Sequence, residues 1–564
     1  MRIVRIWMRC LLTVLLAGGG MAGCGGGGGN GGGAVGSNIG PAPTASMSYQ
    51  ANGLSVSFDA SASHNADGSA PTLAWSFGDG VVASIVKPIH VYSAAGNFTV
   101  KLTVTDEYGN SASTQQVVSV SGANAVGLQS WTWMSGSQTG NSMGVYGSMA
   151  VAAAANTPGA RQGTITWTDG QGRLWLFGGT GYDTQGAVGV LNDLWRFDPA
   201  TAQWSWVNGS KTAGASGNYG TAGAPASGFP GARSNAVSWT DVSGNLWLFG
   251  GNGYDAGGSL GNLNDLWRID AATGKATWVG GAKTANAAGV YGTQGAANAA
   301  NVPGARAYAV SWVDKNGKLW MFGGQTLNAA GTAGATLNDL WMFDPARGLW
   351  TWAGGASTAS NAAGVYGSKG VAAGTNFPGA RLSAQAWTDA SGKLWLFGGS
   401  GYDMAGSAGV LNDMWSYDIA LGAWTWVYGS NLVGAAGVYG SVGVSAGTSA
   451  GNTPSARVGT VGWSDASGML WLFGGGDTRG ELNDLWKFDT VSLQWTWVGG
   501  VAGADSEGVY SSLGVTSSYN TPGARAWSVA WSAGGAFWLF GGGGFDGAGQ
   551  LGNLNDLWKL RPAR

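Results

Sequence analysis

Short apolar runs separated by Gly, Asp and Asn recur along most of the chain and predict β-strands. One repeating unit contains a run that ends at Trp167, the run 174–179 (Leu-Trp-Leu-Phe-Gly-Gly), the run 191–195 (Leu-Asn-Asp-Leu-Trp), and the pair Trp204 and Trp206. Aromatic and branched side chains fit a pleated surface, whereas Gly, Asp and Asn fit the turns between strands. Each unit therefore predicts a small antiparallel sheet of four strands.

The unit occurs six times. Each copy begins with Pro-Gly-Ala-Arg, once written Pro-Ser-Ala-Arg, at Pro158, Pro230, Pro303, Pro378, Pro454 and Pro522. Repetition of this length indicates supersecondary units that pack against their neighbours.

The two ends of the repeat region predict how the array closes. The sixth copy reaches the run 554–558, but the chain ends at Arg564 with no Trp pair after it. Trp131 and Trp133 instead precede the first copy. We therefore expect the N-terminal strand to complete the last sheet, which would join the six sheets in a ring with few exposed strand edges.

The Gly-Gly doublets such as Gly178-Gly179, the Leu-Asn-Asp-Leu-Trp runs and the spaced Trp residues resemble Kelch repeats, over about residues 128–564. The resemblance implies an all-β fold: a six-bladed Kelch-type β-propeller whose N-terminal strand closes the last blade. Kelch propellers include binding scaffolds, a copper-radical sugar oxidase and a sialic acid mutarotase, so the fold alone does not select a function.

Residues 46–122 form a separate predicted domain. The runs 75–80 (Trp-Ser-Phe-Gly-Asp-Gly), 88–92 and 102–106 resemble a PKD domain, which implies an immunoglobulin-like β-sandwich. Such domains are spacers or adhesion modules on surface proteins and beside secreted hydrolases. The alternation from Phe98 to Val104 independently predicts a half-buried strand.

The first residues predict export. Three arginines precede the apolar run 11–17, which is too short to span a bilayer, so residues 1–23 are interpreted as a signal peptide. The small residues before Cys24 resemble a bacterial lipobox, which implies lipidation of Cys24 and an outer-membrane lipoprotein facing the periplasm or the cell surface. The Gly-rich segment 24–45 is predicted to be a flexible tether.

Composition excludes several chemistries from the repeat region. The only Cys and His residues, Cys10, Cys24, His64 and His90, precede it. A copper-radical oxidase, zinc sites and Ser-His-Asp or Cys-His catalysis would need these residue types, so no metal and no cofactor are expected. Only 10% of residues are charged and no basic stripe is present, so we expect no nucleic-acid partner, and membrane association only through the lipid anchor.

Most polar and aromatic residues recur with the unit, which favours structural roles. The Asp of each Leu-Asn-Asp run is interpreted as turn-capping or ion-pairing. A second set, Asp169, Asp241, Asp314, Asp389 and Asp465, is interpreted as hairpin turns. The chain has 32 Trp residues, interpreted as packing between sheets; in the repeat region Trp527 alone lies off the repeated positions.

Two sets of residues are candidates for ligand binding on the face that carries the long loops. The first is the repeated arginine, which could attract an anion such as an acidic sugar or could instead pair with the Asp of a Leu-Asn-Asp run; its members are Arg161, Arg233, Arg306, Arg381, Arg457 and Arg525. The second set is the loop tyrosines, namely Tyr146, Tyr219, Tyr291, Tyr366, Tyr439 and Tyr510, with Tyr182, Tyr254 and Tyr402 of the Gly-Tyr-Asp motif.

The function expected from these features is non-enzymatic recognition of a glycan or an envelope protein through the loop face. The alternative is a carbohydrate-active enzyme, a sugar mutarotase or a glycoside-cleaving enzyme, which should show unrepeated polar residues at the channel mouth. The unrepeated candidates are Asp477, Arg479, Glu481, Asp505 and Glu507, for which a solvated loop is the other interpretation.

Overall fold

A computed structural model of the chain describes residues 41–52, 55–92, 96–120, 130–225, 228–327, 331, 333–358, 361–445, 451–517 and 520–562. The chain divides into two compact units, residues 1–128 and 129–564. Over the described residues the regular secondary structure consists of β-strands only. None of these residues forms a helix long and apolar enough to cross a membrane.

The described residues of the smaller unit form two antiparallel sheets around one core. The first sheet has the order β1-β2-β5 and comprises β1 (Ser48–Asn52), β2 (Ser55–Asp59) and β5 (Ile89–Val91). The second has the order β4-β3-β6-β7 and comprises β3 (Thr72–Ser76), β4 (Val82–Ala83), β6 (Gly96–Thr105) and β7 (Ser111–Val120). Phe58, Trp75 and Tyr92 lie in the shared core.

The predicted half-buried strand is confirmed in β6, where Val100, Leu102 and Val104 are buried and alternate with more exposed residues. His90 is buried in the same core. Its ring stacks on Phe77 and its Nε2 lies 2.7 Å from Asp79 Oδ2. Burial lowers the pKa of His90, although Asp79 opposes this shift. His90 is therefore a packing residue in this unit.

In the described residues of the larger unit, six antiparallel sheets of four or more strands follow one another along the chain. The first four sheets each have four main strands and one short strand, with these bounds: β9 (Arg161–Gln162), β10 (Ile165–Thr168), β11 (Leu174–Tyr182), β12 (Val188–Asp198), β13 (Gln203–Asn208); β14 (Arg233–Ser234), β15 (Val237–Thr240), β16 (Leu246–Tyr254), β17 (Leu260–Ile269), β18 (Ala276–Gly280); β19 (Ala297–Asn298), β20 (Val310–Val313), β21 (Leu319–Phe322), β24 (Leu340–Asp344), β25 (Leu349–Gly354); β26 (Arg381–Leu382), β27 (Gln385–Thr388), β28 (Leu394–Tyr402), β29 (Ala408–Asp418), β30 (Ala423–Tyr428).

A two-stranded ribbon, β22 (Gln325–Leu327) with β23 (Ala333–Thr336), extends the third repeat. The fifth sheet consists of β31 (Val461–Ser464), β32 (Leu470–Gly476), β33 (Glu481–Asp489) and β34 (Gln494–Gly499). The sixth consists of β35 (Thr516–Ser517), β8 (Trp131–Ser135), β39 (Leu551–Leu560), β38 (Ala536–Phe545), β36 (Arg525–Ala526) and β37 (Val529–Ala533).

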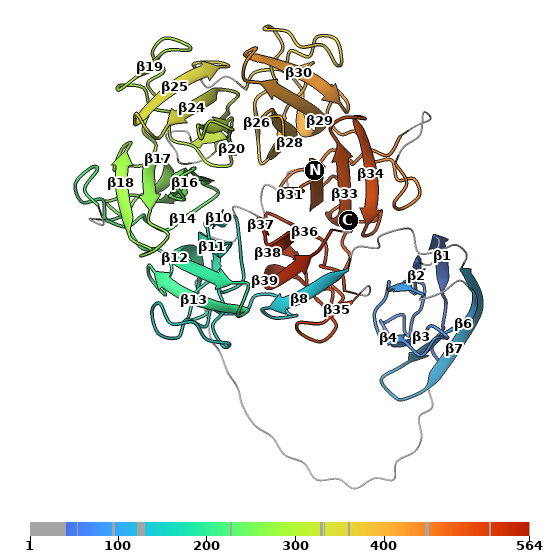
Figure 1. The fold of residues 1–564 in the computed structure, drawn as a ribbon. Helices are drawn as coiled ribbons and strands as arrows, with labels where there is room; N and C mark the ends of the chain where they lie inside the picture. The colour runs from blue at the N-terminus through green and yellow to red at the C-terminus, as the bar shows by residue number, and fades with distance from the viewer. Residues whose placement is uncertain are drawn as a thin grey trace. The chain divides into compact units, whose positions relative to one another are not determined.

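The strand β8 joins the sixth sheet although it precedes the first repeat. It pairs antiparallel with β39, with Trp133 opposite Trp558, and this matches the pairing of Trp206 with Trp195 in the first sheet. The N-terminal strand thus supplies the fourth strand that the sixth copy lacks, as the sequence predicted. In Figure 1 the blue β8 lies beside the red β39.

The six sheets surround a common centre (Figure 1). Their innermost strands contact one another in the cyclic order β10, β15, β20, β27, β31, β37 and back to β10. Six apolar clusters fill the spaces between neighbouring sheets, one for each pair. Each sheet therefore buries both faces against its two neighbours.

A Trp side chain on each innermost strand links its sheet to the next. The indole N–H of Trp167 donates to the carbonyl of Trp247 at 2.8 Å, and the same bond recurs around the cycle until Trp531 donates to the carbonyl of Trp175 at 3.0 Å. These six tryptophans combine apolar burial with a satisfied donor, as Trp requires in a core. The repeated Trp positions are packing positions, as predicted.

The Gly-Gly doublet is required where two sheets come closest. Gly178 and Gly179 have φ of 62° and 93°, at a bulge in the β11–β12 pairing. A Cβ on Gly178 would lie 2.5 Å from the carbonyl oxygen of Arg233 in the next sheet. Only Gly combines this conformation with this approach.

The long connections between sheets cover the outermost strands. Each of them forms a β-bridge or short strand with the outer strand of the following sheet, for example Ala153 with Trp204 and Ala373 with Trp424. Asn156 adds side-chain bonds to the carbonyls of Val151 and Trp204, at 2.9 and 3.0 Å. The connections thus protect strand edges that could otherwise pair with another chain.

Removal of β8 should destabilise the larger unit. A chain that begins at Gly136 would lose the packing of Trp131, which is 4% exposed, and would leave one edge of β39 unpaired. Loss of one large buried aromatic costs about 3–5 kcal/mol. We expect a chain beginning at Gly136 to unfold at a clearly lower urea concentration than one beginning at Gln129. Equal midpoints would contradict this role for β8.

Candidate functional site

Each repeated arginine forms a buried ion pair within its own sheet. In the first sheet Arg161 Nη1 and Nη2 donate to the two carboxylate oxygens of Asp193, at 2.7 and 2.8 Å. Its Nε donates to the carbonyl of Gly159 at 2.8 Å, and Nη1 also donates to that of Gly178 at 3.0 Å. Both charged side chains are 0% exposed.

The loop tyrosine completes this network. Tyr146 Oη donates to Asp193 Oδ2 at 2.6 Å, and the indole N–H of Trp195 donates to the same oxygen at 2.7 Å. Burial raises the pKa of Tyr146, and the Asp193 carboxylate raises it further. Burial alone would lower the pKa of Arg161, but the adjacent carboxylate outweighs it and raises that pKa. The phenol therefore stays neutral and the guanidinium stays charged.

The same network occurs in all six sheets, with the aspartates Asp193, Asp265, Asp339, Asp413, Asp484 and Asp556. The network contains the whole first candidate set and six of the nine tyrosines of the second. These residues are the arginines Arg161, Arg233, Arg306, Arg381, Arg457 and Arg525 and the tyrosines Tyr146, Tyr219, Tyr291, Tyr366, Tyr439 and Tyr510. The expectation that these groups meet a ligand at the channel mouth does not hold. A buried guanidinium needs a buried carboxylate. The structure contains the alternative, in which each repeated arginine pairs with the Asp of a Leu-Asn-Asp run.

The arginine main chain connects neighbouring sheets. The carbonyl of Arg306 accepts a bond from the N–H of Gly251 at 2.9 Å, and its own N–H donates to the carbonyl of Leu263 at 3.0 Å. Arg306 thus joins its own sheet through the side chain and the preceding sheet through the backbone.

The second aspartate set forms hairpin turns, as predicted. Asp169 Oδ1 accepts the N–H groups of Gln171 and Arg173 at 2.9 and 3.0 Å. Its Oδ2 accepts the indole N–H of Trp175 at 2.8 Å. Asp241, Asp314, Asp389 and Asp465 make equivalent bonds.

Tyr182, Tyr254 and Tyr402 remain partly exposed at the loop ends of β11, β16 and β28. The Asp that follows each of them is buried and caps the hairpin; Asp183, for example, accepts the N–H groups of Gln185 and Ala187 at 2.8 and 3.0 Å. Tyr291, Tyr439 and Tyr510 are also partly exposed, but their hydroxyls bond the buried aspartates, whereas the six arginines are buried.

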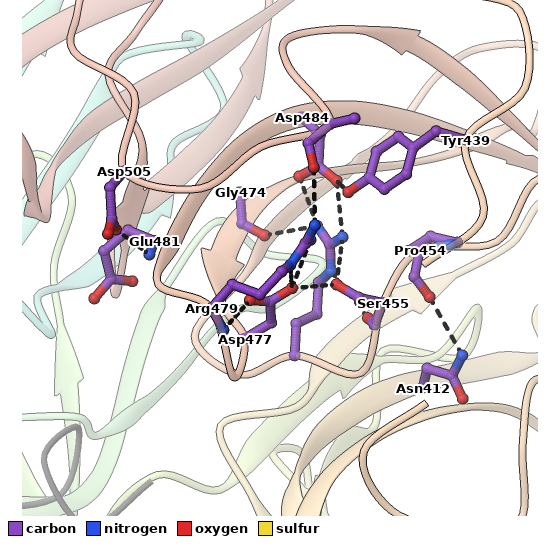
Figure 2. A network of polar contacts seen from close by, with 12 residues as sticks. Asn412, Tyr439, Pro454, Ser455, Gly474, Asp477, Arg479, Glu481, Asp484 and Asp505 are labelled. Atoms are coloured by element: carbon purple, nitrogen blue, oxygen red, sulfur yellow. Dashed lines mark hydrogen bonds and ion pairs between the residues drawn. The ribbon is translucent and has the colours of Figure 1, made fainter. Parts of the chain in front are cut away.

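The fifth sheet departs from the repeat. Its loop between β32 and β33 is short, and Ser455 replaces the usual Gly. Ser455 Oγ donates to Asp477 Oδ2 at 2.9 Å, and Arg479 Nη2 donates to the same oxygen at 2.7 Å (Figure 2). In the first sheet a Cβ at the Ser455 position, which is Gly159, would lie 2.0 Å from the Tyr182 carbonyl, so the short loop makes room for Ser455.

Four of the unrepeated candidates, Asp477, Arg479, Glu481 and Asp505, are held in hydrogen bonds. Burial alone would raise the pKa of Asp477, but the bonds from Arg479 and Ser455 outweigh it and lower that pKa. Asp505 Oδ1 accepts the N–H of Glu481 at 2.9 Å, and the N–H of Asp505 donates to the Glu481 carbonyl at 2.7 Å (Figure 2). These contacts fix the short loop against the next connection.

Glu507, the remaining unrepeated candidate, differs from these four residues. It is partly buried beside the Asp546–Gln550 turn, at a position where other copies carry Met143, Ser216 or Ala363. Burial raises its pKa to about 7, and the charge of Asp546 contributes to the shift. A carboxyl group that titrates near neutrality can exchange a proton under physiological conditions.

The innermost strands also line a cavity of about 350 Å³ in the centre of the ring. Its lining is uncharged and includes Thr166, Thr168, Ser238 and Thr240. Ser238 Oγ donates to the carbonyl of Thr166 at 2.9 Å, so these hydroxyls also link neighbouring strands. The sequence did not predict this cavity, although it shows Ser and Thr at alternate positions of the first strand.

Among the described residues, no group of three or more His, Cys, Asp and Glu side chains is arranged to hold a metal ion. Cys24 and the signal segment lie outside the described residues.

Comparison with known proteins identifies the smaller unit. Residues 40–121 match the PKD domain family. The chain is 36% identical over 85 residues to a pre-pro-metalloprotease, PrtV, of Vibrio cholerae, a match that covers 15% of this chain and 9% of that protein. It is 34% identical over 82 residues to the collagenase ColQ1 of Bacillus cereus, covering 14% of this chain and 8% of the relative.

A microbial collagenase of Vibrio alginolyticus is 35% identical over 69 residues, covering 12% of this chain and 8% of the relative. The chain thus spans less than a tenth of the length of each of these relatives. The PKD match agrees with the predicted β-sandwich.

Breaking one buried pair should be costly. Arg233→Met leaves the Asp265 carboxylate buried without its counter-charge, which typically costs about 3–5 kcal/mol. The matched Lys87→Met breaks a pair whose side chains, Lys87 and Asp59, are 63% and 37% exposed, and exposed pairs contribute about 1 kcal/mol or less. Urea unfolding should separate the two variants, and the double variant Arg233→Met/Asp265→Leu should recover part of the loss. Equal costs for the two single variants would contradict a structural role for the buried pair.

Glu507 should make stability depend on pH. Its folded pKa of about 7 lies above the ordinary 4.5, so the folded state binds the proton more tightly and the free energy of unfolding falls as pH rises from 4.5 to 7. Glu507→Gln removes this penalty. Allowing for partial exposure, the variant should gain about 1–2 kcal/mol over the wild type between pH 4.5 and pH 8. Exposed Glu107, changed to Gln, is the control; a pH-independent difference for Glu507→Gln would contradict the prediction.

Proposed function

We propose that this protein is a cell-envelope lipoprotein that recognises a glycan or an envelope protein without chemical conversion. In this proposal Cys24 carries the lipid, the PKD domain is a spacer, and the six sheets are a six-bladed Kelch-type β-propeller that presents its loop face to the ligand. The PKD match supports an extracellular or periplasmic location, because this domain occurs in secreted bacterial proteins.

One observation carries the proposal. The six repeated Arg and their six partner Asp are buried and paired with one another. What remains on the loop face is largely neutral, with Gly, Ala, Ser, Thr, Asn and Tyr in the connections. Such a surface suits recognition through hydrogen bonds and aromatic contact more than acid–base catalysis.

Glu507 supports the alternative, a carbohydrate-active enzyme. Its pKa of about 7 is suitable for a general acid, and Asp546 is a second carboxylate near it. Asp546 is committed to its turn, however, because Oδ2 accepts the N–H of Gly140 at 2.9 Å and Oδ1 accepts those of Ala548 and Gln550 at 2.9 Å. A two-carboxylate mechanism would therefore need a partner that is already bonded, which favours recognition.

The test is a thermal-shift screen of the full-length protein in detergent against neutral and acidic polysaccharides. A ligand at 100 times its Kd stabilises the folded state by about 2.7 kcal/mol. Recognition predicts a shift with one glycan class and no new reducing ends after long incubation. Reducing ends that disappear in Glu507→Gln would favour the enzyme. If no glycan shifts the protein and no envelope protein is captured by it, the proposed function fails.

A further inference from the structure

Six residues form a closed hydrogen-bonded circle at the start of the innermost strands. Each lies two positions after a repeated arginine, and the six are Gly163, Asn235, Tyr308, Ser383, Gly459 and Trp527. The N–H of each donates to the carbonyl of the equivalent residue in the preceding sheet, at 2.8–3.1 Å, and the bond from Gly163 to Trp527 closes the circle.

The circle lies at the loop end of the central channel. Gln162, next to Gly163, pairs with Thr180 near the loop end of β11, whereas Trp167 pairs with Trp175 at the other end of that strand. The central cavity is lined by residues at that other end, such as Trp167 and Trp239. The circle and the cavity are thus at different levels of the channel.

All six residues have a left-handed backbone, with φ between 50° and 67°. Gly adopts this conformation without strain, and two of the six sheets use Gly. A bulky residue such as Tyr308 or Trp527 pays about 1 kcal/mol or more for it. The repeat unit therefore tolerates Gly here, and the side chains at the other positions require a reason other than the fold.

These side chains differ from copy to copy, and the sequence-based candidates for unrepeated residues did not include them. Asn235, Tyr308, Ser383 and Trp527 are all partly exposed. In a cyclic order of six, Tyr308 and Trp527 are three places apart, so they lie on opposite sides of the mouth. Among the described residues, the indole N–H of Trp527 has no hydrogen-bond acceptor.

The side chains of Trp527 and Asn235 lean over their glycine neighbours. A Cβ on Gly459 would lie 3.1 Å from the Trp527 indole nitrogen, and one on Gly163 would lie 2.5 Å from Asn235 Oδ1. Trp527 also packs against the small cluster of Val410, Ala456 and Val458. The glycines thus provide the space in which the indole and the amide lie along the rim.

The surroundings of the circle are neutral and differ between its two sides. Gln162, Ser234 and Asn252 border it on the first two sheets, whereas Leu382 and Val458 occupy the equivalent positions of Gln162 and Ser234 on the fourth and fifth. The repeated charges nearby are buried ion pairs. An acidic ligand would therefore find no free counter-charge in this network.

We infer that the loop-end mouth of the channel binds one ring of a neutral sugar. The apolar faces of the ring contact Trp527 and Tyr308, and its hydroxyls exchange hydrogen bonds with Asn235 and Ser383. Opposed aromatic side chains with a few amide and hydroxyl groups match the mixed surface of a pyranose. This inference rests on the proposed function, because it names the site and ligand class of the same recognition face.

Residues found at equivalent positions of the circle suggest substitutions that should keep the fold. Trp527→Gly and Tyr308→Asn introduce residues already present at equivalent positions, with the same backbone conformation. Both variants should fold, because the new residues suit the left-handed backbone; Trp527→Gly also loses the contact with Val410, Ala456 and Val458, and urea unfolding measures that loss. The matched control is Tyr108→Asn, which removes a 72% exposed tyrosine from the smaller unit.

The experiment is calorimetric titration of the full-length protein with maltohexaose, cellohexaose, mannohexaose, xylohexaose and a galacturonate hexamer. We expect one neutral hexamer to bind, with Kd raised at least tenfold in Trp527→Gly and Tyr308→Asn and unchanged in Tyr108→Asn.

Unchanged affinity in both mouth variants would overturn the inference and leave glycan recognition elsewhere on the loop face intact. Binding of the galacturonate hexamer alone, or of no hexamer, would also overturn it. Capture of an envelope protein in that last case would preserve the proposed function, and its absence would remove both.

Discussion

The buried ion pair between the repeated arginine and the Asp of the Leu-Asn-Asp strand is the interaction on which the larger unit depends. In the third sheet Arg306 binds Asp339 through two parallel bonds and also binds the carbonyls of Gly304 and Gly323. Its main chain meets the Gly doublet of the preceding sheet. One residue thus fixes the start of the inner strand, its own third strand and the joint between two sheets.

Such a pair stabilises the fold only because its geometry is complete. Two charges taken from water lose several kcal/mol of hydration each, and they recover it only when nearly every donor and acceptor is used. The carboxylate also accepts a tyrosine hydroxyl and an indole N–H, so the network consumes most of the polar groups that could have served a ligand. The repeat therefore builds a rigid, uncharged frame, and variation among the copies is left to positions that do not carry the frame.

Those variable positions are concentrated where the repeat imposes backbone geometry but not side-chain identity. The hydrogen-bonded circle at the loop end requires a left-handed conformation in every copy, yet it accepts Gly, Asn, Ser, Tyr or Trp. The fifth sheet shows the same freedom in another form, because a shorter loop admits Ser455 and its bond to Asp477. Function in such a molecule is sought in departures from the repeat.

The sequence by itself determined the strand pattern, the number of copies, the closing role of the strand with Trp131 and Trp133, and the packing role of the repeated Trp residues. Periodic strands and turn residues are local signals, and repetition makes them readable. Whether Arg161 faces a ligand or Asp193 was decided only by the tertiary structure, because the two residues are distant in sequence and their burial depends on all neighbouring sheets. The sequence could not predict the circle that contains Trp527 either, since its bonds join residues of different copies. Its left-handed backbone also could not be predicted from residue types as different as Gly, Tyr and Trp.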